Sequence, residues 1–118
     1  MEYLALIHAD QTVWETMTDV ERDAAYEQYG EFADAARGAG VLVGGEELAS
    51  TASATTVRVR DEQRVVTDGP YAEVKEALGG FFILDCASFD DALDWAARIP
   101  AVHHGAVEVR PVHVDPEA

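Results

Sequence analysis

The stretch GGFFILDCA, Gly79 to Ala87, contains four consecutive apolar residues between glycine and aspartate. A strand with one face in water alternates apolar and polar residues, whereas a continuous apolar run is typical of a strand covered on both faces. A second run of this kind, EYLALIH, spans Glu2 to His8. We therefore predict two central strands, one at the beginning of the sequence and one in its second half.

Helix signals follow each of these strands. TDVE, Thr18 to Glu21, is a capping box, in which the threonine hydroxyl and the glutamate carboxylate each bond the other residue's amide. It begins a predicted helix whose core stripe is Ala25, Tyr29, Phe32 and Ala36 and which ends at Gly38 and Gly40. SFDD, Ser88 to Asp91, caps a second helix that stops before Pro100, with Ala92, Leu93, Ala96 and Ala97 as its buried stripe.

Four further strands are predicted between and after these helices. VLVGGEELA, Val41 to Ala49, is a strand with a bulge at its glycine pair. TTVRVR, Thr55 to Arg60, and RVVTDG, Arg64 to Gly69, form a hairpin across DEQ. GAVEVRPVHV, Gly105 to Val114, closes the sequence, with Val107 and Val109 on one face and Glu108 and Arg110 on the other.

The order β-α-β, hairpin, β-α-β predicts an α+β fold in one domain, residues 1–118: a ferredoxin-like antiparallel sheet with two helices and an inserted β-hairpin. Two helices cover only one face of such a sheet. Because the two central strands are apolar on both faces, we expect the uncovered face to meet a second copy of the chain in a homodimer.

The charge balance argues against two classes of partner. The 23 acidic and 8 basic residues give a net charge of −15, which repels nucleic-acid backbones and anionic membranes. We predict neither a leader segment nor a membrane span. Cys86 lies in an apolar run and is expected to be a buried thiol, which fits a reducing, cytoplasmic location.

The segment TDGPYAEVKEALGG, Thr67 to Gly80, has two interpretations. In the structural one, Asp68 caps a short helix, Gly69 supplies an unusual backbone conformation, and Pro70 is the first helical residue; Tyr71, Glu73 and Glu76 fill the early turns and Gly79 ends it. In the functional one, the free amides at the start of that helix bind an anion and Asp68 acts as an acid or base.

Three other groups of residues are candidates, each with a plainer alternative. Lys75 with Glu73 and Glu76 is either a binding cluster or a solvated helix face. His8 and Asp10 at the end of the first strand are either a catalytic pair or a structural hydrogen bond. Arg110 binds an anion or pairs with an acid at the interface. His103 and His104 are adjacent and point apart, so we predict no metal site.

The segments quoted above resemble the YCII-related proteins, in particular their DGPF-domain subgroup. The resemblance rests on Asp68-Gly69-Pro70, Glu73, Lys75-Glu76, the pair Gly79-Gly80 and the terminal VEVRP, and runs from Tyr3 to Val112. It implies a dimeric α+β barrel and a family whose members lack an assigned reaction. Some of these proteins are linked to extracytoplasmic-function sigma factors. This chain departs from the pattern at Tyr71, where the subgroup has Phe, and at Val74, where it often has Thr or Ser.

No P-loop, nucleotide-binding fingerprint or Ser-His-Asp motif occurs in the sequence. The charged block that begins with Asp68-Gly69-Pro70-Tyr71, set against an otherwise apolar sheet, favours the leading hypothesis: a small cofactor-independent enzyme that acts on a small organic molecule, with Asp68 or His8 as acid or base. Arg110 or Lys75 would hold an anionic group, and Gly69, Pro70, Tyr71, Glu73 and Glu76 would line the site. The alternative is a noncatalytic binding or regulatory module whose acidic surface contacts a sigma factor.

Overall fold

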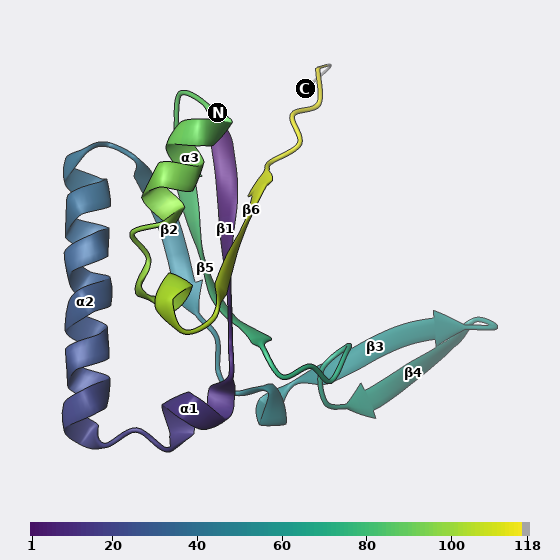
Figure 1. The fold of residues 1–118 in the computed structure, drawn as a ribbon. Coiled ribbons are helices and arrows are strands. Elements are labelled where there is room, and N and C mark those ends of the chain that lie inside the picture. Colours follow the sequence, from purple (N-terminus) through teal and green to yellow (C-terminus); the bar gives the residue numbers. More distant parts are fainter. Residues whose placement is uncertain (117–118) are drawn as a thin grey trace.

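The computed structural model describes residues 1–116 and has an α+β architecture (Figure 1). A four-stranded antiparallel sheet has the strand order β2-β5-β1-β6, and a separate two-stranded sheet consists of β3 and β4. The predicted ferredoxin-like arrangement is confirmed. The elements are β1 (Glu2–Ala9), α1 (Gln11–Glu15), α2 (Asp19–Gly38), β2 (Leu42–Glu47), η1 (Thr51–Ser53), β3 (Thr55–Arg60), β4 (Gln63–Asp68), β5 (Ala77–Asp85), α3 (Phe89–Ala96), η2 (Pro100–His103) and β6 (Ala106–Pro111).

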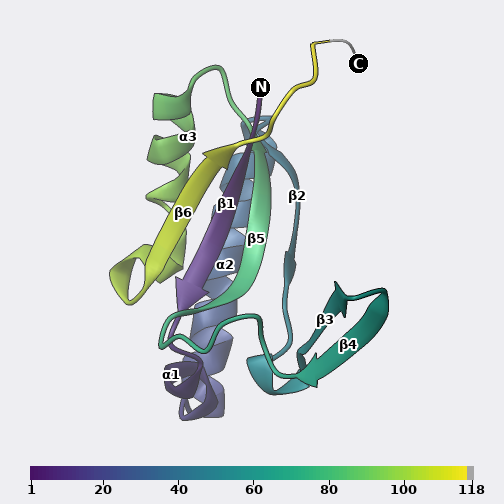
Figure 2. The same ribbon diagram turned by 90° about the vertical axis from the view of Figure 1, so that its right-hand side faces the viewer.

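The two apolar runs form the central strands β5 and β1, as predicted. Helices α2 and α3 cover one face of the sheet, while Figure 2 looks onto the other face, which no helix covers. We call the uncovered side the open face. Tyr3, Ala5 and Ile7 of β1 are buried beneath the helices, whereas Leu4 and Leu6 lie on the open face and are half-buried. Strand β1 therefore contributes apolar side chains to both sides of the sheet.

Helix α2 begins and packs as its sequence predicts. Thr18 accepts a hydrogen bond from the Glu21 amide and Glu21 accepts one from the Thr18 amide, so both halves of the capping box are present. Phe32 and Ala36 are buried, with Tyr29 packed beside them. The Phe32 ring lies 5.0 Å from that of Phe82 on β5. This contact joins the helix layer to the sheet.

Helix α3 buries a narrower stripe than predicted. Ser88 caps it by accepting from the Asp91 amide, and Ala92 and Ala96 are buried. The predicted burial of Leu93 and Ala97 is wrong: Leu93 is 41% exposed and Ala97 is exposed. A helix of two turns touches the sheet along one line, and these two residues lie beside that line, toward solvent.

The short helix predicted after Pro70 is absent. Residues 69–76 have no regular secondary structure, and β5 already begins at Ala77. The Gly69 amide donates to the carbonyl of Ala54, and the Thr56 hydroxyl donates to the carbonyl of Gly69. Because the start of the segment is bound to the neighbouring hairpin, and because so short a helix is marginal in water, tertiary contacts override the local helix signals.

Several ends of elements also differ from the prediction. Helix α1 occupies a stretch for which no helix was predicted, β2 is shorter at both ends, and β6 ends at Pro111 rather than Val114. A bulge is present in β2, but it lies at Val43, just before the predicted glycine pair, since the pairing of β2 with β5 shifts between Leu42 and Gly44. No helix of the described residues is long and apolar enough to cross a bilayer.

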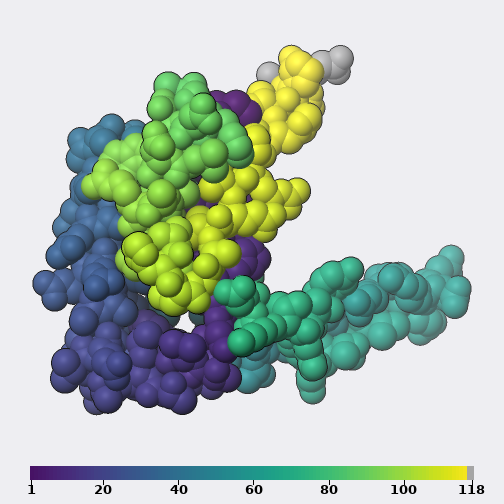
Figure 3. Space-filling view, in the orientation of Figure 1, coloured from purple at the N-terminus to yellow at the C-terminus, as the bar shows by residue number. Residues whose placement is uncertain are grey.

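The hairpin predicted between residues 55 and 69 is confirmed and extends away from the rest of the molecule (Figures 1 and 3). We call β3 and β4, residues 55–68, the arm. Asp61 and Glu62 connect the strands, both with positive φ, as the right-handed twist of a tight hairpin requires. Figures 1 and 2 together place the arm on the side of the open face.

Candidate functional site

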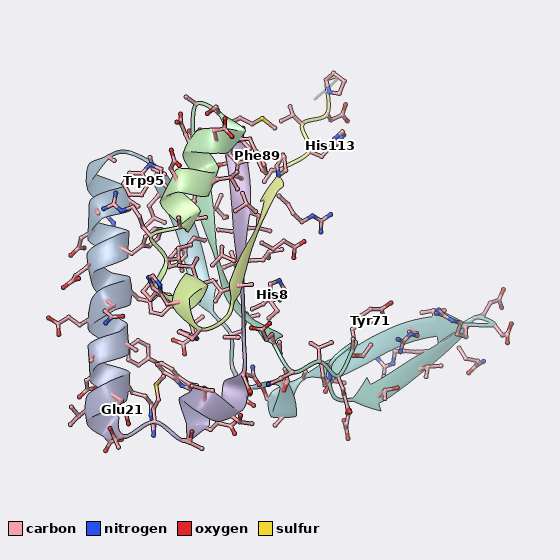
Figure 4. All side chains as sticks on the ribbon, in the orientation of Figure 1. His8, Glu21, Tyr71, Phe89, Trp95 and His113 are labelled. Carbon is pink, nitrogen blue, oxygen red and sulfur yellow. The ribbon has the colours of Figure 1, made fainter. Side chains whose placement is uncertain are left out.

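His8 and Glu108 form a hydrogen-bonded pair on the open face. In the pairing of β1 with β6, Ala106 lies opposite His8 and Glu108 lies opposite Leu6, so Glu108 is the diagonal neighbour of His8 on the same face. His8 Nε2 lies 3.1 Å from Glu108 Oε1. The side chains are 29% and 52% exposed, and Figure 4 shows His8 on the side from which the arm extends. A ligand can therefore reach this pair.

The partner of His8 determines which ring nitrogen is available for chemistry. A carboxylate accepts hydrogen bonds and donates none, so Nε2 carries the proton that is shared with Glu108. In the neutral imidazole the free lone pair is then on Nδ1. The pair fixes the ring orientation and leaves Nδ1 as the nitrogen that can take up or release a proton.

Asp10, which the sequence predicts as the partner of His8, has a different role. Its carboxylate caps α1 by accepting from the Thr12 amide at 3.0 Å and from the Thr12 hydroxyl at 2.7 Å. These hydrogen bonds, with a smaller contribution from the charge of Lys75, lower the pKa of Asp10. The predicted pair is wrong because α1 begins immediately after β1, and the Asp10 carboxylate accepts a hydrogen bond from an unpaired amide in the first turn of that helix.

Next to the end of β1 lies an open cleft of about 630 Å³. Its walls come from the end of β1, α1, the segment 69–76 and the residue that follows η2; Figure 3 shows the surface hollowed between α1 and η2. The lining side chains are Asp10, Val13, Val74, Lys75, Glu76 and His104. The cleft thus combines one lysine, two carboxylates and an imidazole with two valines. Such a set can bind a small polar molecule through its charged groups.

The segment 67–80 is divided between two places. Its second half brings Lys75 and Glu76 to the cleft. Its first half belongs to the base of the arm: Asp68 ends β4 opposite Thr55, and Gly69 is hydrogen-bonded to Ala54.

The remaining residues of the first half also lie away from the cleft lining. Tyr71 is exposed, with the Arg58 guanidinium 5.5 Å from the centre of its ring, and Glu73 is exposed as well. Pro70 is half-buried. The structure does not bring Asp68 together with Lys75 and Glu76 around one cavity. The catalytic role of Asp68 and the binding roles of Gly69, Pro70, Tyr71 and Glu73 stay predictions.

Arg110 lies on the open face, as the alternation of β6 predicts. It is opposite Leu4 and two residues from Glu108, while Val107 and Val109 pack toward the core. Glu108 is hydrogen-bonded to His8. Arg110 therefore adds a positive charge on the same face as the histidine pair.

Cys86 is a poor candidate for a nucleophile. It is buried, as predicted, and desolvation raises the pKa of its thiol, with the carboxylates of Asp91 and Asp85 adding to the effect. His103 and His104 lie at and after η2 and are exposed. Within residues 1–116, no group of three or more His, Cys, Asp or Glu side chains is arranged to hold a metal ion.

Sequence reasoning did not predict the contact of Glu108 with His8 or the contribution of His104 to the cleft. The alternation of β6 places Glu108 on the face opposite Val107 and Val109. Glu108 is on the same face of the sheet as His8 because β6 lies beside β1, and the sequence does not show that these two strands are neighbours. His104 gives no periodic signal, since it lies in a loop.

Comparison with known proteins identifies the family of this chain. The sequence model of the YCII-related domain matches residues 1–114. The chain belongs to the YCII-related family. An uncharacterized protein of Rhizobium meliloti (strain 1021) is 38% identical over 121 aligned residues, which cover 95% of this chain and 92% of the relative. The match to the YCII-related domain spans β1 with His8, the arm, the cleft and Glu108, so the candidate site lies entirely within the family domain.

Proposed function

We propose that this YCII-related protein is a cofactor-independent enzyme that transfers a proton on a small organic anion, with His8 as its acid-base group. The observation that carries the proposal is the accessible His8–Glu108 pair, with Nε2 and Oε1 3.1 Å apart. Carboxylate-oriented imidazoles serve as general acids and bases because they change charge near neutral pH.

In the proposed reaction, Nδ1 of His8 removes a proton from a carbon next to a carbonyl group. The electron pair of that C–H bond moves toward the carbonyl oxygen, and the imidazole becomes a cation. Glu108 stabilises this cation by accepting the hydrogen bond from Nε2. The same nitrogen returns the proton at another position, so that protons and electrons balance without a further reactant.

The negative group of the substrate would be held by Lys75 or Arg110. The chain has 8 basic residues against 23 acidic ones, so its overall field repels anions, and either cation would have to attract the substrate against that field. Lys75 lines the cleft, and Arg110 is on the open face with His8. The substrate class that fits is a small carboxylate or phosphate ester with a carbonyl group.

A homodimer belongs to the proposal. The open face carries half-buried apolar side chains from both central strands, with Leu4 opposite Ile83 and Leu6 opposite Phe81. Two such faces would pack about 10 Å apart, as sheets do when they stack. Packing of this kind would remove much of the water around His8 and Glu108, which strengthens their interaction with a substrate.

Deuterium exchange tests the reaction without knowledge of the substrate. The protein is incubated in D₂O with a panel of small 2-oxo and 3-oxo acids, and loss of the C–H signal is followed by proton NMR. We expect enzyme-dependent exchange in one or more compounds, reduced by about 10²–10⁴ in His8→Ala. His113→Ala, an exposed histidine labelled in Figure 4, is the matched control. Equal exchange rates in wild type and His8→Ala would refute the role of His8.

A noncatalytic module that binds a basic partner, such as a sigma factor, is the alternative, and the net charge of −15 favours it. Affinity capture at low and high salt separates the two functions. An electrostatic protein partner is lost as salt rises, whereas an enzyme for small molecules keeps its exchange activity without such a partner.

A further inference from the structure

The arm has one apolar face that nothing in residues 1–116 covers. In the pairing of β3 with β4, Val57 lies opposite Val66, and Val59 lies opposite Arg64. The three valines are on the same face and are 58%, 61% and 51% exposed (Val57, Val59 and Val66). We call Val57, Val59 and Val66 the valine face. All six residues of β4 are exposed, and in β3 only Thr56 and Arg58, on the opposite face, are half-buried.

A free arm of this kind is unfavourable in water. An isolated two-stranded hairpin is at best marginally stable in water. Three exposed valines on one side of it make its contact with water more unfavourable still. The opposite face has some cover, since Arg58 lies over the ring of Tyr71 and the Thr56 hydroxyl bonds the Gly69 carbonyl. The valine face has no such cover, which indicates that another surface packs on it.

The position of the arm favours a second copy of the chain as that surface. Figures 1 and 2 show the arm extending from the side of the open face, at the end of the sheet where β1 ends. A copy stacked on the open face would have its sheet about 10 Å away. Six residues of strand span about 20 Å. The arm is thus long enough to pass the sheet of that copy and lie along its side.

Charge favours the same occupant. The arm carries Arg58, Arg60 and Arg64, three of the 8 basic residues in the chain. The arm also has three acidic residues, Asp61, Glu62 and Asp68, so it is neutral, and the net charge of −15 resides in the remainder of the chain. Arg64 is on the valine face, opposite Val59. A second copy therefore offers an acidic surface to an arm that is rich in arginine.

We propose that the arm of each protomer clasps the second copy, with the valine face buried against the partner and Arg64 facing carboxylates of the partner. The inference rests on the homodimer proposed above and assigns the contact that holds it. The open face and the arm then act together, since each protomer is gripped by the arm of the other under two-fold symmetry.

Isotope-filtered NMR on a mixed dimer tests the clasp. One copy carries ¹³C-labelled valine methyl groups, and the other is unlabelled. We expect intermolecular nuclear Overhauser effects from the methyl groups of Val57, Val59 and Val66, and none from Val20, which is 79% exposed on α2. A dimer in which the three valines show contacts only within their own chain would overturn the proposal.

Dissociation constants from analytical ultracentrifugation give an independent readout. Threonine has the shape of valine and favours strands, so the triple variant Val57→Thr, Val59→Thr, Val66→Thr keeps the hairpin while making its face polar. The dimer Kd should rise by about 10⁴-fold, because the two arms of the dimer bury six valines and each half-exposed valine withdrawn from water contributes somewhat under tenfold. Arg64→Glu should raise it further, and Val20→Thr should leave it unchanged.

The outcomes separate the clasp from the homodimer itself. Phe81→Asp places a charge on the open face and should give a particle of about 12.8 kDa, the mass of one chain. If Phe81→Asp dissociates the dimer but the threonine triple variant has the Kd of wild type, the clasp is wrong and the open-face dimer stands. If wild type is monomeric at all concentrations, both are wrong, while the exchange assay still decides the role of His8.

Discussion

Replacing Gly45 by alanine should destabilise the protein much more than the same change at its neighbour Gly44. A Cβ atom at Gly45 would lie 2.5 Å from the carbonyl oxygen of Phe81 and 2.7 Å from Cδ1 of Phe82. A Cβ atom does not approach nonbonded heavy atoms this closely in real proteins, so the surrounding atoms would have to move. At Gly44 no atom lies within 4 Å of such a Cβ. The two positions therefore differ in packing, although they are adjacent on β2.

The contacts at Gly45 give the magnitude. Phe81 contributes a backbone atom, which cannot turn aside as a side chain can. The ring of Phe82 is held against Phe32, with ring centres 5.0 Å apart. Either β2 moves away from β5 or the core shifts, and overpacking of this kind costs about 1–3 kcal/mol. At Gly44 the new methyl group reduces the freedom of the unfolded chain and should stabilise by up to about 1 kcal/mol.

Urea denaturation followed by circular dichroism measures both variants. Protein concentration is held fixed, because the stability of a dimer depends on it. With an m-value of about 2 kcal/mol/M, a loss of about 3 kcal/mol for Gly45→Ala lowers the midpoint by about 1.5 M. The midpoint of Gly44→Ala should stay within about 0.5 M of wild type. Equal midpoints for the two variants would show that the close approach of β2 to β5 is not what requires Gly45.

Further predictions concern the helix caps and the thiol. Thr18→Ala should cost about 1 kcal/mol in thermal or urea unfolding. The pKa of Glu21 is lowered first by the hydrogen bond from the Thr18 amide and then by the Thr18 side chain, so in an NMR titration of the variant it should rise only part of the way to its ordinary value, because the amide remains. The pKa values of Asp10 and Glu21 lie below their ordinary values of 3.8 and 4.5, so the stability that these two groups contribute is complete above those values and should be lost as pH falls through the lowered ones. Thr12→Val should remove the largest single contribution at Asp10, the hydrogen bond from the Thr12 hydroxyl, and leave the bond from the Thr12 amide. Cys86 should react with iodoacetamide many times more slowly in the folded protein than in urea, and equal rates would contradict its burial.

Much of the fold was predictable because its signals are local. The capping box at Thr18 and the cap at Ser88 need only neighbouring residues, and both are present. The apolar runs in β1 and β5 identified the central strands, and two helices for one sheet implied an uncovered face. The burial of Leu93 was wrong because the width of a buried stripe depends on the surface opposite the helix.

The candidate site was less predictable because its contacts join distant residues. His8 was identified from its position at the end of a strand, but its partner lies 100 positions away. Lys75 and Glu76 were identified from a segment that was expected to be helical, and they reach the cleft in an irregular one. Residue type could be read from the sequence, whereas the neighbours of each residue could not.

The sequence alone determined the family, the order of the six strands with α2 and α3, the caps that begin those two helices and the acidic character of the chain, because each depends on residues close together or on simple counts. Tertiary structure decided the conformation of residues 69–76, where hydrogen bonds between Gly69 and the hairpin outweigh a helix signal worth a few tenths of a kcal/mol per residue. It also decided that Glu108 rather than Asp10 faces His8, since that choice depends on which strand lies beside β1.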